Sequence, residues 1–229
     1  FNIATGVTLT GAVSGEADAD TLALQGAAAN ITGIYDGGTA VDVLNLSGLG
    51  GTVNATLTAQ GASGFDGTTT SVGGGFQDVD TLTGTGTGTL TGLNTASTWT
   101  LDGTPTYTDG TETLNFTAFS ILQGGTAIDT FAVTANSTFV LNGGAGADLF
   151  NIATGVTLTG AVSGEADIDT LTLQGAAAAI SGVFDGGTGV DVLDLSALGG
   201  TVNATLTAQG ASGFDGTTSA GTGGFQDVD

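Results

Sequence analysis

Short stretches in which hydrophobic residues alternate with threonine or another polar residue recur along the whole chain. After Asp129 the order is Thr-Phe-Ala-Val, after Asp169 it is Thr-Leu-Thr-Leu, and after Asp191 it is Val-Leu-Asp-Leu. Alternation with period two is typical of a β-strand with one buried face, and threonine and β-branched residues favour strands. No segment carries a sustained helical stripe with caps. The pattern therefore predicts an all-β protein whose leucines and phenylalanines point inward.

A glycine-rich turn and an acidic residue precede nearly every alternating stretch. Gly-Gly-Ala-Gly-Ala leads into Asp148, and Gly-Gly-Thr-Gly-Val leads into Asp191. The same position is held by Asp20, Asp42, Asp80, Asp129 and Asp169, with Glu112 in a weaker copy. The spacing is 22 residues from Asp20 to Asp42, 19 from Asp129 to Asp148 and 21 from Asp148 to Asp169. Units of this size cannot bury a core alone, but they bury a continuous one when they stack.

The predicted architecture is therefore a parallel β-solenoid (β-helix) with coils of about 20 residues, whose equivalent strands lie about 4.8 Å apart. The 38 residues from Asp42 to Asp80 are expected to hold about two units. Around residues 64–67 the turn chemistry survives, but the strand signal is lost. Residues 97–101 are expected to form an extra strand before Glu112. A string of tandem β-sandwich domains is the alternative, since short strands separated by turn signals also fit that class.

A longer repeat contains the short one. Residues 1–80 realign with residues 150–229 at a shift of 149, and the two copies differ at 13 of 80 positions. Residues 81–149 complete the first long repeat, and residues 150–229 begin the next. Phe1 matches Phe150 and Asp229 matches Asp80, so both ends fall inside motifs. We expect one continuous solenoid that is a window from a longer array.

The composition removes several classes of function. The 229 residues include 22 acidic ones and no Lys, Arg, His, Cys or Met, which gives a net charge of -22. Binding to nucleic acid needs Lys or Arg to neutralise phosphates, and an anionic membrane surface repels such a chain. No run of about 18 apolar residues predicts a membrane span. The hydrophobic fraction of 40% argues against disorder.

The same composition disfavours catalysis. No His, Cys, Lys or Arg is present to act as a general base, a nucleophile or an oxyanion partner. Paired carboxylates of the glycosidase kind remain, but they recur in the long repeat, whereas active sites are normally singular. The sequence therefore predicts that the protein is not an enzyme.

Stacked acidic residues create an electrostatic problem in a parallel solenoid. Like charges about 5 Å apart destabilise each other, and the chain has no basic residue to neutralise them. Calcium would do so, because it takes hard oxygen ligands. The candidate metal ligands are the carboxylates at the start of the strands and their outer neighbours, namely Asp18, Asp20, Asp42, Asp80, Asp129, Asp148, Asp167, Asp169 and Asp191. The alternative is that each Asp caps backbone N–H groups in its own turn and stays solvated.

Two resemblances sharpen these expectations. Residues 143–150 and 186–193 resemble the GGxGxDx-apolar nonapeptide of calcium-binding RTX proteins, with one motif per coil here where RTX rolls carry two. This resemblance implies that Asp148 and Asp191 are the best calcium ligands. It adds backbone carbonyls from Gly143, Ala145, Gly186 and Thr188.

The second resemblance covers nearly the whole chain. The runs Asp80-Thr-Leu-Thr-Gly, Ser97-Thr-Trp-Thr-Leu-Asp-Gly and Ile128-Asp-Thr-Phe are similar to repeats of giant bacterial surface proteins, including filamentous-haemagglutinin-like adhesins. This resemblance implies an elongated β-solenoid that is extracellular or on the cell surface.

The expected function is structural: a stiff, cation-stabilised fibre or filament whose chains self-associate head to tail or laterally. The alternative is the stalk of a large adhesin whose binding head lies outside this segment, and a glycan- or ice-binding module ranks third. Six Asn-x-Ser/Thr sites permit N-glycosylation: Asn30, Asn45, Asn54, Asn115, Asn136 and Asn203. Trp99 and Tyr107 are candidates either for stacking on sugars or for packing in the core.

Overall fold

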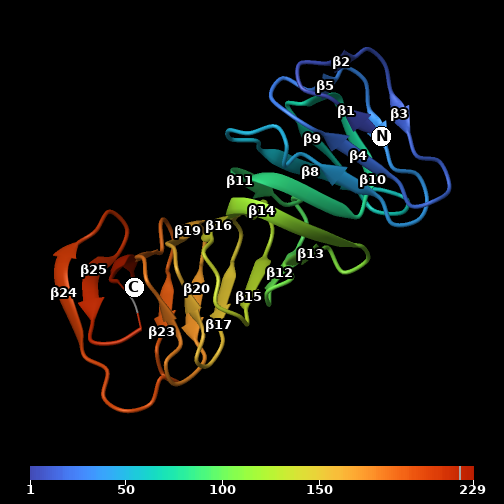
Figure 1. Cartoon of the computed structure of the whole chain (residues 1–229). Helices are drawn as coiled ribbons and strands as arrows, with labels where there is room; N and C mark the ends of the chain where they lie inside the picture. The colour runs from blue at the N-terminus through green and yellow to red at the C-terminus, as the bar shows by residue number, and fades with distance from the viewer. Residues whose placement is uncertain (222) are drawn as a thin grey trace. The chain divides into compact units, whose positions relative to one another are not determined.

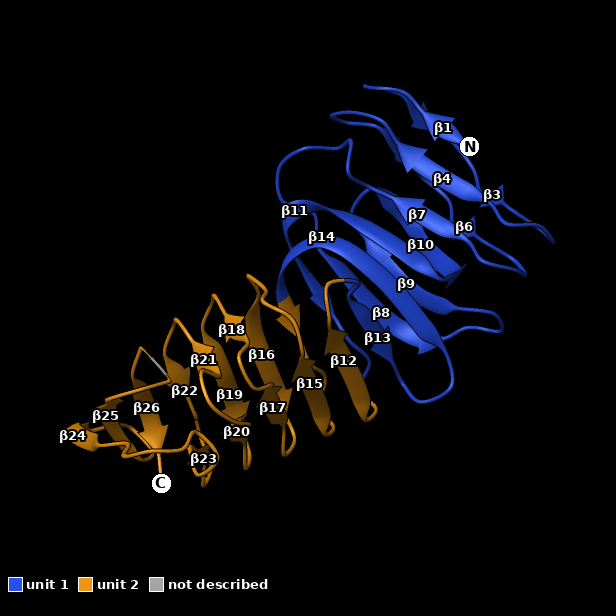
Figure 2. Cartoon of the chain, turned by 60° about the horizontal axis from the view of Figure 1, so that its bottom comes forward, with its two compact units in different colours: residues 1–93, 104–121 blue, residues 94–103, 122–229 orange. Residues whose placement is uncertain are grey.

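The structure is a computed structural model that describes residues 1–221 and 223–229 (Figure 1). The described residues form strands, turns and loops without any helix, which confirms the predicted all-β class. None of them belongs to a helix long and apolar enough to cross a bilayer. The chain divides into two compact units, which Figure 2 colours separately. The first unit comprises residues 1–93 and 104–121, and the second comprises residues 94–103 and 122–229.

The first unit contains three rows of parallel strands. Its strands are β1 (Asn2–Ile3), β2 (Thr8–Leu9), β3 (Val13–Ser14), β4 (Thr21–Leu24), β5 (Asn30–Ile31), β6 (Tyr35–Asp36), β7 (Val43–Asn45), β8 (Ala55–Gln60), β9 (Phe65–Thr69), β10 (Val72–Val79), β11 (Thr81–Thr91), β13 (Thr106–Thr108) and most of β14 (Thr113–Gln123). One row is β1–β4–β7–β11, and a second is β3–β6–β10. The third row pairs β2 with β5.

The second unit repeats this arrangement over more coils. Its strands are β12 (Ser97–Leu101), β15 (Asp129–Val133), β16 (Val140–Ala145), β17 (Leu149–Ile152), β18 (Thr157–Leu158), β19 (Val162–Ala166), β20 (Thr170–Leu173), β21 (Ala179–Ile180), β22 (Phe184–Asp185), β23 (Val192–Asp194), β24 (Ala204–Gln209), β25 (Phe214–Thr218) and β26 (Phe225–Val228). One row is β12–β15–β17–β20–β23, a second is β16–β19–β22–β26, and the third pairs β18 with β21. Figure 2 shows the first two rows side by side.

Apolar side chains follow each row in register. In the second unit Phe150 pairs with Phe131 on one side and Leu171 on the other, and all three are buried. The Phe131 ring stacks on Phe150 at a centroid distance of 5.0 Å and on Trp99 at 5.5 Å. In the first unit Leu22, Leu44 and Leu82 follow one another in the same way. Each side chain is thus buried by its equivalents on the neighbouring strands of its row.

Residues 42–80 depart from the prediction of about two units. The Asp42 N–H donates directly to Asp80 and Thr81 pairs with Val43, so one longer unit with an antiparallel hairpin fills this stretch. The expected loss of strand structure at residues 64–67 is wrong, because β9 begins at Phe65 and pairs antiparallel with both β8 and β10. The strand was not predicted because Gly67, in its middle, has a low strand propensity. A Cβ there would lie 2.3 Å from the Phe76 ring and 2.6 Å from the Thr56 carbonyl, so the strand needs glycine. The sheet pairing is therefore mixed, with antiparallel hairpins set between parallel rows. The extra strand expected at residues 97–101 is confirmed as β12.

Candidate functional site

The acidic residues that precede the strands form one continuous feature in each unit, which we call the aspartate ladder. Its members in the first unit are Asp20, Asp42 and Asp80, and in the second unit Asp129, Asp148, Asp169, Asp191 and Asp229. Five of them have no exposed surface, namely Asp42, Asp129, Asp148, Asp169 and Asp191. Asp20 and Asp80 are half-buried, and Asp229 is exposed. Complete burial of an unpaired carboxylate is costly, so the contacts of these groups matter.

Backbone amides of the preceding coil satisfy one oxygen of each carboxylate. The Asp148 N–H donates to Asp169 Oδ1 at 2.8 Å, and the Asp129 N–H donates to Asp148 Oδ1 at 2.7 Å. The Asp169 N–H donates in the same way to Asp191 at 2.8 Å. In the first unit the Asp20 N–H donates to Asp42, at 2.7 Å. The ladder therefore joins one coil to the next, rather than capping only its own turn as the alternative interpretation had it.

A serine takes the aspartate position at one rung. Ser97 is the register partner of Asp129, and its hydroxyl donates to Asp129 Oδ1. Asp129 also accepts the Gly125 N–H of its own turn at 2.7 Å. Ser97 was not among the predicted site residues because it is not acidic. Its position immediately before the alternating stretch Thr-Trp-Thr-Leu is the signal that identifies it. Glu112 lies instead in the turn between β13 and β14, where its N–H donates to Asp109 at 3.0 Å.

The second carboxylate oxygen of several rungs is enclosed. Oδ2 of Asp42, Asp148, Asp169 and Asp191 has no hydrogen-bond partner among the described residues. A glycine five residues earlier in the chain packs against each of these carboxyl groups. A Cβ on Gly143 would lie 2.3 Å from Asp148 Oδ2 and 2.8 Å from the Gly164 carbonyl oxygen. The first glycine of the motif is therefore required by the close approach of carboxylate and backbone.

Burial changes the titration of the ladder. It raises the pKa of both the Asp148 and the Asp169 carboxyls to about 7, while the amide hydrogen bond from the preceding coil opposes this shift and neighbouring acids add to it. Burial likewise raises the pKa of Asp42, Asp129 and Asp191. Near neutral pH the ladder therefore holds some protons, which lowers the repulsion between carboxylates without any basic residue.

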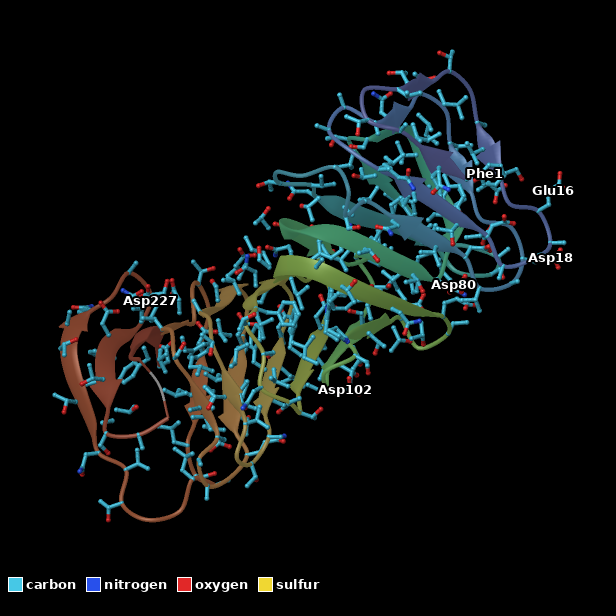
Figure 3. All side chains as sticks on the ribbon, in the orientation of Figure 1. Phe1, Glu16, Asp18, Asp80, Asp102 and Asp227 are labelled. Atoms are coloured by element: carbon cyan, nitrogen blue, oxygen red, sulfur yellow. The ribbon has the colours of Figure 1, made fainter. Side chains whose placement is uncertain are left out.

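Two pairs of acidic residues lie outside the ladder, one in the loop after β3 and the other at the end of β19. Figure 3 shows Glu16 and Asp18 projecting from the loop that follows β3, and both are exposed. Their equivalents Glu165 and Asp167 are also exposed. Asp167 Oδ2 accepts the Gly146 N–H at 3.1 Å, and Glu165 accepts from Gln123 Nε2 at 2.9 Å.

Some of the predicted calcium ligands belong to the aspartate ladder, and others belong to the exposed acidic pairs. The Gly143 and Gly186 carbonyls point at glycines of the preceding coil, the Ala145 N–H donates to the Gly125 carbonyl, and Thr188 donates to the Glu165 carbonyl. Calcium takes about six to eight oxygen ligands. Within residues 1–221 and 223–229 no group of three or more acidic side chains is arranged to hold a metal ion. Calcium binding by Asp148 and Asp191 stays a prediction. For either carboxylate to bind calcium through both oxygens, its buried Oδ2 atom would have to become accessible.

The two aromatic candidates for sugar stacking are core residues. Trp99 and Tyr107 have no exposed surface. Trp99 stacks on Phe131, and the Tyr107 hydroxyl accepts the Leu93 N–H at 2.9 Å. Their packing role, one of the two predicted, accounts for both residues.

Comparisons with known proteins identify no relative. No protein-family model, no curated protein and no solved structure matches the chain.

Proposed function

We propose that the chain is part of a parallel β-solenoid that serves as a stiff structural rod, assembled into an extracellular fibre or filament. The in-register row β12–β15–β17–β20–β23 carries this proposal. The rungs between Asp129 and Asp191 recur after 19, 21 and 22 residues. Such regular stacking is expected of a solenoid coil and is not expected of separate sandwich domains.

The aspartate ladder supports a mechanical role. Every rung adds a side-chain-to-backbone hydrogen bond between coils, beside the backbone pairing of the strands. Bending or pulling the rod apart at any coil therefore breaks backbone bonds, a buried carboxylate contact and an apolar contact together. An extracellular setting is supported by the adhesin resemblance. The lack of Lys and Arg adds to this, because it removes every trypsin-type cleavage site.

The rod is tested with arrays of different length. Genes encoding two, four and six copies of the 149-residue repeat would be expressed and imaged by cryo-electron microscopy. Coils stacked about 4.8 Å apart predict that every added repeat lengthens a straight particle by a constant step of roughly 30 Å. Flexible strings of globules would contradict the solenoid and favour tandem sandwiches. A straight array that does not self-associate would instead favour the adhesin stalk over the filament.

Cation stabilisation is the second part of the proposal, and the exposed acids Glu16, Asp18, Glu165 and Asp167 are its most accessible ligands. We expect calcium to raise the melting temperature relative to EDTA and expect the double variant E165Q/D167N to reduce that increase. Sodium chloride at matched ionic strength is the control. An equal effect of sodium chloride would show general screening and contradict a calcium site.

A further inference from the structure

The strongest unassigned feature is an apolar face on the second unit, which we call the acceptor face. It surrounds an open hollow of about 320 Å³ lined mainly by Leu193, Leu195, Leu206, Phe214 and Val228. Leu206 is 61% exposed and Phe214 is 47% exposed. Within this unit, β24 and β25 lie at the opposite end of the strand row from β12 (Figure 2).

The first long-repeat copy contains the same face in a covered state. The residues that line the hollow are identical in the two copies, with Leu44, Leu46, Leu57, Phe65 and Val79 as the equivalents. Leu57 is 3% exposed and Phe65 is fully buried. The chain therefore shows what this surface looks like when it is occupied.

Residues 81–121 provide that cover. Strand β11 runs parallel to β7, with Leu82 opposite Leu44, and continues beside β8, with Leu90 opposite Ala55. The Leu46 N–H donates to the Thr83 carbonyl at 2.8 Å. The ring of Tyr107 meets Phe65 edge to face at a centroid distance of 5.4 Å. The cover thus supplies an edge strand, two leucines and an aromatic ring.

We propose that the acceptor face is a docking site for a β-strand segment with the sequence of residues 81–121, supplied by a further repeat. By equivalence with the first copy, Leu82 lies opposite Leu193, Leu90 lies opposite Ala204, and Tyr107 packs on Phe214. Addition of a strand to an exposed sheet edge, with pockets for alternate side chains, is a general mode of recognition. The proposal rests on the proposed repeat array, since the occupant is part of the same repeat.

The docking segment and the chain that receives it are both negatively charged, so their association depends on ionic strength. The occupant segment contains Asp102, Asp109 and Glu112 and no basic residue, and the chain that receives it carries -22. Association between two acidic partners is opposed at low ionic strength and is favoured by screening. Binding is therefore expected to tighten as salt increases, which is the reverse of an ion-paired interface.

The test is a titration of a fluorescently labelled synthetic peptide of residues 81–121 with the full chain, followed by anisotropy at 0.5 M sodium chloride. We expect saturable binding with one peptide per chain. Leu206→Asp and Phe214→Asp are expected to weaken it at least tenfold, and Tyr107→Ala in the peptide to weaken it severalfold. Val7→Asp is the matched control, because Val7 is 46% exposed on the first unit, and it is expected to keep the affinity within twofold.

A second measurement avoids dependence on a free peptide. The sequence of residues 81–121 is appended after Asp229, and amide hydrogen exchange is compared with that of the original chain. In the extended chain we expect new protection of amides in β23 and β24. We also expect Leu206→Asp to destabilise the extended chain clearly more than it destabilises the original chain.

Several outcomes would overturn the docking site. One is that the peptide does not bind and the extended chain shows no new protection. Another is that the peptide binds equally well to the Leu206→Asp variant. Concentration-dependent self-association abolished by both Leu206→Asp and Val7→Asp, and unaffected by the peptide, would assign the face to a second copy docking end to end. Straight arrays without peptide binding would contradict only the docking site, whereas peptide binding with flexible arrays would contradict only the rod.

Discussion

Residues 1–80 and residues 150–229 have almost the same sequence and the same strands, yet different parts of each copy are buried. Phe1 is 56% exposed, whereas its equivalent Phe150 is fully buried against Phe131. At the other end of the copy the difference reverses, because Leu57 is buried and Leu206 is exposed. Burial is thus decided by whether a neighbouring coil is present and not by the residue itself.

Strand pairing, in contrast, is shared by the two copies. Thr21 pairs with Val43 as Thr170 pairs with Val192, and the hairpin of β8 and β9 reappears as β24 and β25 with the same bulge. Turn chemistry and strand pairing inside a copy therefore do not need the next coil. Each copy thus specifies its own strand pairing, whereas its neighbours provide the burial.

A charge placed at equivalent positions of the two copies is expected to give the largest difference in stability. Leu57→Asp buries an unpaired carboxylate and is expected to destabilise the first unit by about 4 kcal/mol or more. Leu206→Asp is expected to change the free energy of unfolding by only about 0.5 kcal/mol. Urea unfolding followed by circular dichroism measures both. Equal effects would show that the two faces are equally buried in solution.

Removal of an aromatic ring tests the opposite end of the copy. Phe150→Ala deletes a fully buried ring and is expected to cost about 3–5 kcal/mol. Phe1→Ala removes a largely exposed ring, so the expected cost is about 0.5 kcal/mol or less. The readout is the shift of the denaturation midpoint at constant slope. A large loss in the Phe1 variant would contradict the exposure assigned to it.

The ladder gives a third test, in which an acceptor is removed. Asp169→Ala deprives the buried Asp148 N–H of its partner, which is expected to cost about 1–3 kcal/mol. Asp20 is the equivalent in the first copy, is half-buried, and accepts no such amide within the described residues. Asp20→Ala is therefore expected to cost clearly less. Measurement at pH 5 limits the contribution from removing a charge.

For a change of one pH unit, the smallest expected effect is the pH dependence of stability. The pKa of Asp148 and Asp169 is about 7 in the folded chain, above the value of about 3.9 for an unfolded aspartate. Between these values the folded chain binds more protons, so stability is fully present near pH 4 and declines as the pH rises to about 7. Each such carboxyl contributes a slope of up to about 1.4 kcal/mol per pH unit.

Asp169→Asn keeps an acceptor and removes one titration, so it is expected to flatten the fall of the melting temperature between about pH 4 and pH 7. Asp20→Asn is the matched variant from the first copy. A melting temperature that rises with pH over this range in the unmodified chain would contradict the assigned burial of the ladder.

The sequence predicted the strands that follow an acidic residue, because alternation and glycine turns are local signals. It also predicted the extra strand at Ser97–Leu101. It did not reveal β9, since Gly67 serves a close approach to Phe76 that no propensity scale contains. The aspartates were correctly identified as recurrent but were assigned to solvent or calcium. Their engagement by amides of the preceding coil depends on a register between residues about 20 positions apart, which spacing alone does not specify.

Direction is built into the aspartate ladder. The amide always belongs to the earlier coil and the carboxylate to the later one, as from Asp148 to Asp169. Units therefore stack head to tail, because two like ends brought together would set carboxylate against carboxylate or amide against amide. If the proposed filament grows from such units, it would be polar along its whole length and have two chemically different tips. Each tip would then add units at its own rate and need its own cap.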